Sequence, residues 1–512
     1  MKNYLKLSNF TLVLLAITFW WSFTIMERPR LGWFFYLAFF IAVAYGYLKW
    51  GKAINHHETD VFSSERMKWL VLAVVVFGGV LRVLWVRYSV VEQTSDFQFY
   101  ANMAEQVYRG EYLLTPRKQS GPGLVGAALY TILGGINVNS YLYLQAIVST
   151  VTVWLVYLVT KRAFNKMAGL LAAFIFAVNP EAWVYTNVFG NEPFIAFFFT
   201  LSVWAVGEAM QTLQSQGRRA HLLMALAGLS LGLSQYMRAT ALIMAICFVA
   251  YLIVVARYDY RKVLLLFGVF TLVTAPILAF NFQKLGIVSY APSQYSGFSL
   301  LIGTKKETQG RYYGEFLDEV AAEIREQESE GTLNFRQKVA ALVAKSGLSE
   351  AECAGVISNQ IAMQMALDRI RKDGPELLKI GITYKIPVFF AGVNGYSWSL
   401  ETSSLLTELP MELFERWLAS FTRMLQYLML IAGVVTLLGL VLVGPEQDKH
   451  LVGIIAICTI AFGVMHGFVE VQPKYHYSIL SAFPIVAFGC LRYSRDVYRR
   501  VAGCRWASML RL

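Results

Sequence analysis

The chain has 512 residues, of which 56% are hydrophobic and 15% are charged, and its mean hydropathy is +0.49. Soluble domains carry about 25% charged residues, so this composition excludes an ordinary soluble enzyme and indicates an integral membrane protein. The net charge of +12 does not indicate nucleic-acid binding, because Lys and Arg of membrane proteins collect at the cytoplasmic face. We expect the lipid bilayer as a partner and no nucleic acid. The cysteines show no metal or disulfide spacing; they are Cys247, Cys353, Cys458, Cys490 and Cys504.

Apolar stretches predict an all-α membrane protein with about twelve spans. A helical span needs ~20 mostly apolar residues. In chain order the candidate spans are 10–26, 32–48, 68–88, 141–160, 167–183, 193–210, 221–237, 239–256, 263–281, 422–443, 451–468 and 476–492. The first span follows Lys2 and Lys6 and is not followed by a small-residue cleavage site, so we interpret it as a retained anchor.

The loops between these spans predict the orientation. If both termini are cytoplasmic and the spans alternate, the basic loops all lie inside, as the positive-inside rule requires. These basic residues are Lys49, Lys52, Arg66, Lys68, Lys161, Arg162, Lys166, Arg218, Arg219, Arg257, Arg261, Lys262, Arg492, Arg495, Arg499, Arg500 and Arg505. The outer pieces are then 89–140, 184–192 and 282–421. We expect a multi-pass protein of the cytoplasmic (inner) membrane, with its active site facing the periplasm or exterior.

This orientation divides the chain into five parts. Residues 1–67 form a transmembrane hairpin and a cytoplasmic linker, and 68–281 form a transmembrane core that includes the outer loop 89–140. Residues 282–421 form a long helical outer loop, 422–492 form the C-terminal spans, and 493–512 form a basic cytoplasmic tail.

The outer pieces contain predicted helices of their own. Apolar residues at helical spacing predict an amphipathic helix over 97–109 at the membrane interface. Ser349 and Glu352 form a capping box that opens a helix ending near 373–375. The apolar stretch 384–398 is short and Gly-rich, and from the sequence it either re-enters or spans the membrane.

Two carboxylates at outer span ends are candidate catalytic residues, because ionisable groups at a membrane edge are costly to place. Asp96 follows the third span, and Tyr100 lies one helical turn later. Glu192 opens the sixth span, directly before Pro193. Each also has a purely structural interpretation: Asp96 as a helix cap, and Glu192 as a carboxylate favoured by the helix dipole.

The remaining ionisable groups at this face are mostly cationic. Arg238 lies in the tight turn between the seventh and eighth spans, and the long loop carries Lys305, Lys306 and Arg311 beside its glycines. These cations either snorkel to lipid phosphates or bind one specific phosphate. The last outer turn holds His466, Glu470, Lys474, Tyr475 and His476 within eleven residues. His466 by itself is most simply a core histidine.

Short motifs in this order resemble the GT-C superfamily of glycosyltransferases, above all bacterial relatives of the protein O-mannosyltransferases and the lipid A aminoarabinose transferase. The resemblance extends over residues ~68–490. The motifs are 95–100, Gly121-Pro122, Glu192-Pro193-Phe194, 237–242, 299–303 with Gly310, and Glu470 with 474–476. The chain departs from the family where Phe97 follows Asp96 in place of a second acid, and where Lys474 precedes Tyr475 in place of Arg.

The resemblance implies a GT-C fold and a polyprenyl-phosphate-linked sugar as donor, with a protein, lipid or glycan as acceptor. Some relatives also suggest a divalent metal, Mg²⁺ or Mn²⁺, at Asp96 and Glu192; no cofactor is certain. The chemistry agrees, because a phosphate leaving group needs positive charge and the acceptor hydroxyl needs a base. We expect Asp96 as the general base, with inversion at the anomeric carbon, and Glu192 as the second catalytic carboxylate.

The other candidates receive binding roles. The donor-phosphate candidates are Arg238, Lys305, Lys306, Arg311 and Lys474, and the acceptor or sugar candidates are Tyr100, Glu470, Tyr475 and His476.

Two other functions are compatible with about twelve spans. A secondary transporter would show related halves and more charged residues in mid-span, and this sequence shows neither. An O-antigen polymerase or ligase also has a long outer loop, but uses lipid-diphosphate glycans. The Asp motif of the first outer loop favours the GT-C interpretation over this second alternative.

Overall fold

The computed structural model describes residues 2–26, 64–211, 217–393, 400, 403–405, 411–490 and 492–493. The expected span 32–48, Cys504 and the tail beyond Tyr493 lie outside these residues. The described part is almost entirely helical, which confirms the predicted fold class. It includes one ladder of two three-residue strands, in which β1 (Ser89–Val91) pairs antiparallel with β2 (Ser403–Leu405).

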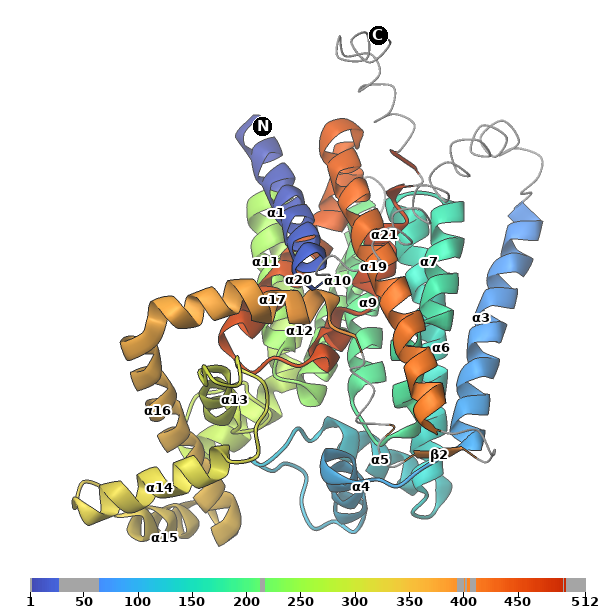
Figure 1. The fold of residues 1–512 in the computed structure, drawn as a ribbon. Coiled ribbons are helices and arrows are strands. Elements are labelled where there is room, and N and C mark those ends of the chain that lie inside the picture. The colour runs from blue at the N-terminus through green and yellow to red at the C-terminus, as the bar shows by residue number, and fades with distance from the viewer. Residues whose placement is uncertain are drawn as a thin grey trace.

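Long helices form a bundle that runs top to bottom in Figure 1. Among the described residues, seven helices are long and apolar enough to cross a membrane, or eight if the bent pair 166–178 and 180–187 is one span. The helices of the bundle are α1 (Lys2–Met26), α3 (Ser64–Tyr88), α6 (Val138–Ala163), α7 (Lys166–Val178), α9 (Glu192–Gln211), α10 (Gly217–Met237), α11 (Ala241–Ala250), α12 (Tyr260–Phe280), α19 (Met411–Val443), α20 (Glu446–Phe468) and α21 (Ala482–Ala487).

Several expected spans differ in the structure. The stretch 239–256 forms α11 and a five-residue π-helix, η3 (Tyr251–Val255), which together are shorter than a full span. The stretch 476–492 is broken between a 3₁₀ helix, η6 (Pro473–Ile479), and the six-residue α21. Hydropathy alone cannot distinguish these segments from spans, because a helix buried in protein is as apolar as one in lipid. The count of twelve therefore stays a prediction.

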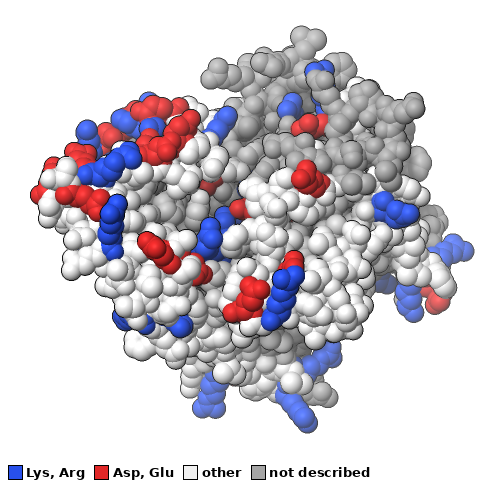
Figure 2. All heavy atoms as spheres, turned by 90° about the horizontal axis from the view of Figure 1, so that it is seen from below, with Lys and Arg blue, Asp and Glu red and all other residues white. Residues whose placement is uncertain are grey.

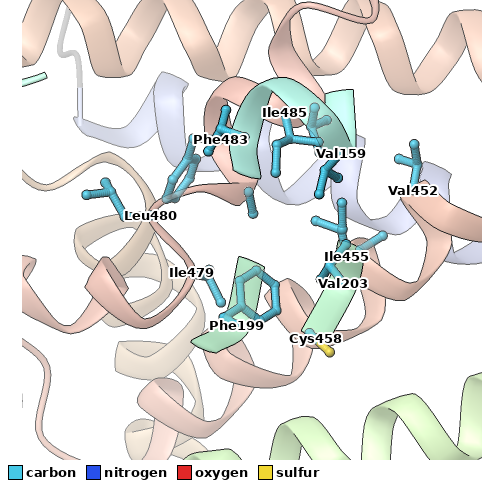
Figure 3. Packing of buried hydrophobic residues seen from close by; sticks show 14 of the residues in the cluster. Val159, Phe199, Val203, Val452, Ile455, Cys458, Ile479, Leu480, Phe483 and Ile485 are labelled. Atoms are coloured by element: carbon cyan, nitrogen blue, oxygen red, sulfur yellow. The ribbon is translucent and has the colours of Figure 1, made fainter. Parts of the chain in front are cut away.

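Small residues and large apolar side chains together build the core of the bundle. A Cβ at Gly228 would lie 2.2 Å from the backbone oxygen of Leu266, so glycine lets α10 and α12 approach closely. In Figure 3, Phe199 and Val203 of α9 pack with Ile455 and Cys458 of α20 and with Phe483 of α21. The C-terminal helices are thereby fixed against α9, the helix that begins at Glu192.

A buried arginine forms hydrogen bonds at the point where the chain bends between α7 and the next helix. Arg82 of α3 is fully buried; its Nε donates to Ser149 Oγ at 2.7 Å and its Nη1 donates to Ala177 O at 3.2 Å. Ala177 O lies at the C-terminus of α7, where the helix dipole favours a cation. Beyond it the chain bends by 68° into α8 (Pro180–Trp183) and the 3₁₀ helix η1 (Val184–Asn187). This bend leads directly to the start of α9.

Basic loops expected on the cytoplasmic side gather at one end of the bundle. Arg162 pairs with Glu208 at 3.4 Å, and Arg492 pairs with Asp448 at 2.8 Å. The start of α1 lies at this end in Figure 1. The opposite end, which we call the site end, carries α4 (Ser95–Tyr108) and α5 (Gly121–Leu133). The grouping agrees with the predicted alternation of the spans.

Residues 296–380 form a second group of helices, most of which project to the left at the site end in Figure 1. Phe298, Phe316 and Ile357 contribute to a hydrophobic core separate from that of the bundle. The helices of this part are α13 (Ser296–Gly303), α14 (Phe316–Ser329), α15 (Phe335–Ser346) and α16 (Glu350–Ile380). The chain then returns to the bundle through the π-helix η5 (Gly381–Lys385) and α17 (Ile386–Ala391), whose Phe389 and Phe390 belong to the core of the bundle. A further π-helix, η4 (Asn281–Leu285), joins α12 to this part.

The two helices predicted in the outer pieces are present. The capping box of Ser349 and Glu352 opens α16, which kinks at Asp373, close to the expected helix end. Beyond the kink, α16 turns across the bundle towards α17 (Figure 1). The six-residue α17 is buried and too short to span alone, and 394–399 lie outside the described residues. The predicted helix 97–109 is α4, which buries Phe97 and Tyr100.

Cysteine labelling tests the orientation. Ala340 of α15 is exposed, so an Ala340→Cys variant, in a background with Cys490 and Cys504 replaced by Ser, is expected to react with a membrane-impermeant maleimide added outside intact cells. Reaction only after the cytoplasmic face is opened would contradict the orientation.

Candidate functional site

A cavity of about 290 Å³ opens at the site end, between the start of α4, the start of α9, α13 and the turn after α20. Figure 2 shows this end face-on; its densest group of charged side chains lies on the side where α14–α16 project. The charged residues that line the cavity are Asp96, Lys118, Glu192, Arg238, Glu470 and Lys474, together with His466. They come from five separate parts of the sequence.

Asp96 lies in the first turn of α4, at the mouth of the cavity. Its Oδ1 is 2.7 Å from the Nζ of Lys118, and both side chains are partly exposed. The preceding Ser95 has a φ of +50°, a left-handed conformation that is rare for a residue with a Cβ. Among the described residues Asp96 accepts no amide hydrogen bond that would make it a helix cap, so Lys118 rather than the helix orients its carboxylate.

Glu192 lies deeper and is 8% exposed. Its Oε2 accepts a hydrogen bond from the backbone amide of Asn191 at 3.0 Å, and the Asn191 side chain donates to Met237 O at 2.7 Å. The second bond ties the start of α9 to the end of α10, next to Arg238. The placement at the start of a helix also stabilises the charge of Glu192 through the helix dipole.

A stack of aromatic rings contacts Arg238 in the same cavity. The guanidinium of Arg238 lies 4.7 Å from the ring centre of Tyr475, which stacks on His466 at 4.9 Å. His466 in turn stacks on Phe389 at 5.0 Å. Among the described residues no carboxylate lies within ion-pair distance of Arg238. The cation–π contact with Tyr475 thus holds the guanidinium at the cavity. Its N–H groups can then donate to an anionic ligand.

Burial shifts the proton affinities of the groups around the cavity. It lowers the pKa of Lys474 to about 8, against the opposing effect of Glu192, Asp96 and Glu470. It raises the pKa of the Glu470 carboxyl above its usual range. The pKa of Tyr100 is also raised, by burial first and then by Asp96 and Glu192. Lys474 is therefore a cation that titrates near physiological pH.

Tyr100 joins two parts of the cavity wall. Its hydroxyl donates to Gln119 Oε1 at 2.6 Å, and Gln119 Nε2 donates to Ser293 Oγ at 3.4 Å. The amide of Gln294 donates to Pro116 O at 2.7 Å. These bonds attach the loop that carries Lys118 to the segment before α13.

Seven of the eleven predicted site residues therefore meet at one cavity; they are Asp96, Glu192, Arg238, Lys474, Tyr100, Glu470 and Tyr475. Lys305, Lys306 and Arg311 do not line it. Lys305 pairs with Glu319, Lys306 lies 3.3 Å from Asp373 and 3.0 Å from Glu376, and Arg311 lies over the ring of Tyr384. The two lysines therefore pair with acidic side chains of α14 and α16, and the sequence alone could not predict that these side chains lie nearby.

His476 also lies away from the cavity. It is fully buried, and its Nε2 lies 2.7 Å from Oε2 of Glu181. Lys474, Tyr475 and His476 follow one another in the 3₁₀ helix η6, in which successive side chains point about 120° apart. Lys474 and Tyr475 can thus face the cavity while His476 faces the bundle interior.

Sequence reasoning missed Lys118, Gln119 and Tyr295, all of which line the cavity. Lys118 also lies 4.9 Å from the ring centre of Tyr295. The sequence contains only a weak indication of these residues. Arg117, Lys118 and Gln119 form a polar run before Gly121, but an irregular loop has no periodicity from which to infer where its side chains point. His466, interpreted from the sequence as a core histidine, both lines the cavity and belongs to the core stack.

Asp96 and Glu192 are the cavity residues that were expected to hold a metal. Within the ranges that the structure describes, no group of three or more His, Cys, Asp or Glu side chains is placed to bind a metal ion. Any ion at this pair would need further ligands from substrate or water.

Comparison with known proteins agrees with this architecture. Residues 124–280 match the model of the dolichyl-phosphate-mannose-protein mannosyltransferase family. The oligosaccharyltransferase of Archaeoglobus fulgidus, tethered to an acceptor peptide with an NVT sequon, is similar with a TM-score of 0.50 and 14% identity over 86% of this chain and 50% of that chain. The chain thus spans about half the length of that relative. The similarity shows that the chain has the GT-C fold.

Two further structures resemble the chain at lower TM-scores. The archaeal oligosaccharyltransferase AglB from Archaeoglobus fulgidus, with an inhibitory peptide and a dolichol-phosphate, gives a TM-score of 0.49 and 15% identity over 88% of this chain and 52% of that chain. ArnT from Cupriavidus metallidurans, bound to undecaprenyl phosphate, gives a TM-score of 0.36 and 14% identity over 86% of this chain and 80% of that chain. Comparison with curated proteins found no match to the chain.

Proposed function

We propose that this protein is a membrane glycosyltransferase that moves a sugar from a polyprenyl-phosphate donor to a hydroxyl acceptor at the outer face of the inner membrane. One observation carries the proposal: a single cavity gathers the carboxylates of Asp96 and Glu192 with the cations Arg238 and Lys474. The matched family segment, 124–280, includes Glu192 and Arg238, and the fold supports the same reaction class.

Asp96 acts as the general base of the proposed reaction. The acceptor oxygen attacks the anomeric carbon, its proton passes to the Asp96 carboxylate, and the bond from the anomeric carbon to the phosphate oxygen breaks. The electron pair of that bond leaves with the lipid phosphate. A base on the face opposite the leaving group produces inversion at the anomeric carbon.

Arg238 and Lys474 stabilise the departing phosphate. The guanidinium offers paired N–H donors that match phosphate oxygens, and the ammonium adds a second positive charge. Lys118, which neutralises Asp96 at 2.7 Å, must give up that contact or share it before the carboxylate accepts a proton. Tyr100, Glu470 and Tyr475 form the remaining wall, against which the sugar and the acceptor would bind.

A divalent metal fits this donor set only in part. Mg²⁺ is commonly held by one or two carboxylates together with phosphate oxygens and water, and Asp96 and Glu192 would be its protein ligands here. When bound, such an ion would supply further positive charge to the phosphate.

Transfer by purified protein in lipid vesicles tests the proposal. We expect radiolabelled sugar to move from a polyprenyl-monophosphate donor to an acceptor extract of the outer envelope. The polymerase or ligase alternative requires transfer from lipid-diphosphate glycans instead. A transporter would move solute across sealed vesicles without forming a glycosidic bond, and either of those results would contradict the proposal.

Donor binding should weaken as the pH rises through about 8. The pKa of Lys474 is lowered to about 8. Its side chain therefore carries a positive charge below that pH and loses this charge above it. We expect the affinity for the polyprenyl-phosphate donor to fall between pH 7 and pH 9. A Lys474→Arg variant, which keeps its charge in this range, should lose most of this dependence. An unchanged pH dependence in this variant would assign the effect to another group.

A further inference from the structure

A buried acid–histidine pair lies behind the cavity, in the interior of the bundle. Glu181 of α8 and His476 of η6 are both completely buried, and Glu181 Oε2 lies 2.7 Å from His476 Nε2. Ionisable side chains within a membrane bundle are costly, so their presence points to a function. Neither residue lines the main cavity.

Hydrogen bonding fixes the protons of this pair. The Nδ1 of His476 lies 2.9 Å from Phe389 O, and because a carbonyl oxygen only accepts, Nδ1 must carry a hydrogen. Nε2 and Oε2 at 2.7 Å then require a second proton between them, since two lone pairs would repel. The pair therefore holds one shared proton and is neutral overall, which lowers the cost of burying it.

The other carboxyl oxygen of Glu181 has no such partner. Among the described residues, none donates a hydrogen bond to Oε1, although this atom is fully buried. Glu181 and Glu192 both line a second, small cavity of about 10 Å³, together with Tyr185 and Tyr477. That volume corresponds to the space a single water molecule needs, and a buried water normally has two or more polar partners.

We propose that Glu181 and His476 are positioning residues for the transfer reaction: through one water in the small cavity they hold the Glu192 carboxylate in place at the back of the main cavity. The water donates one hydrogen to Glu181 Oε1 and the other to Glu192. Glu192 is then held from both sides, by this water and by the Asn191 amide. The role rests on the proposed function, but the connection between the two cavities does not.

Histidine nitrogen shifts test the connection without any activity measurement. The chain has six histidines, so ¹⁵N-histidine labelling in nanodiscs, with a His476→Gln variant for assignment, isolates the His476 signals. We expect a protonated Nδ1 and an Nε2 signal that moves in a Glu192→Gln variant, although the hydrogen bonds of the His476 ring go to Phe389 O and Glu181. An Nε2 signal that is unchanged in Glu192→Gln would overturn the proposal.

Kinetics of a Glu181→Gln variant test the positioning role. Gln keeps the shape and can still bond to His476, but it cannot hold the shared proton. We expect kcat to fall by about 10- to 100-fold, as for a slightly displaced reacting group, with the KM values for donor and acceptor unchanged.

A matched control separates positioning from general destabilisation. Tyr258 is also buried, and its hydroxyl donates to Ala209 O at 2.9 Å, so Tyr258→Phe removes a buried hydrogen bond away from both the small cavity and His476. We expect this control to keep both its kcat and the His476 shifts. Equal loss of kcat in both variants, or none in Glu181→Gln, would contradict the positioning role. If Glu181→Gln does not fold, or no donor supports transfer, the shift in Glu192→Gln decides alone.

Discussion

Replacing Asp96 with Asn is expected to reduce sugar transfer by roughly 10²–10⁴-fold while leaving folding and donor binding intact. This range is what a general base typically contributes to a reaction. Asn matches Asp in size and caps a helix about as well, but its amide cannot accept the acceptor proton. The structure adds a reason to expect normal folding, because Asp96 pairs with the partly exposed Lys118 rather than with a helix amide.

The measurement is turnover at saturating donor, together with donor affinity and thermal stability. Glu105→Gln is the matched control, because Glu105 lies on the same helix and pairs with the exposed Arg109 without lining the cavity. We expect the control to turn over normally. Near-normal turnover in Asp96→Asn would make Asp96 a structural residue and Glu192 the first candidate for the base.

Replacing Arg238 with Ala is expected to weaken donor binding by about 10- to 150-fold. A charge-assisted hydrogen bond is worth about 1.5–3 kcal/mol, and about 1.4 kcal/mol corresponds to a factor of ten. The guanidinium lies 4.7 Å from the ring centre of Tyr475, and no carboxylate of the described residues is within ion-pair distance of it. A phosphate is therefore the partner that its position favours.

Binding of a polyprenyl phosphate to protein in nanodiscs measures this effect. Arg311→Ala is the control: it removes a second cation once expected at the phosphate, which the structure places over Tyr384. We expect Arg311→Ala to bind normally and Arg238→Lys to recover only part of the affinity, because Lys lacks the paired donors of Arg. Unchanged affinity in Arg238→Ala would remove this residue from the site.

The sequence by itself determined the membrane character of the chain and most of its long helices. Apolar runs of about 20 residues specify spans through the cost of exposing backbone and polar groups to lipid. Strong local signals also specified α4 and the capping box at Ser349, because both depend on residues within one or two turns. The Asp96 and Glu192 candidates followed from their position at span ends.

Tertiary structure alone decided which side chains meet. Lys118 contacts Asp96 from an irregular loop 22 positions later in the sequence, and Glu181 contacts His476, which lies 295 positions later. Lys305 and Lys306 looked like phosphate ligands until the helices α14 and α16 brought Glu319, Asp373 and Glu376 to them. Charge pairing acts over a few ångströms in space, and distance along the sequence carries no information about it once the chain turns between helices.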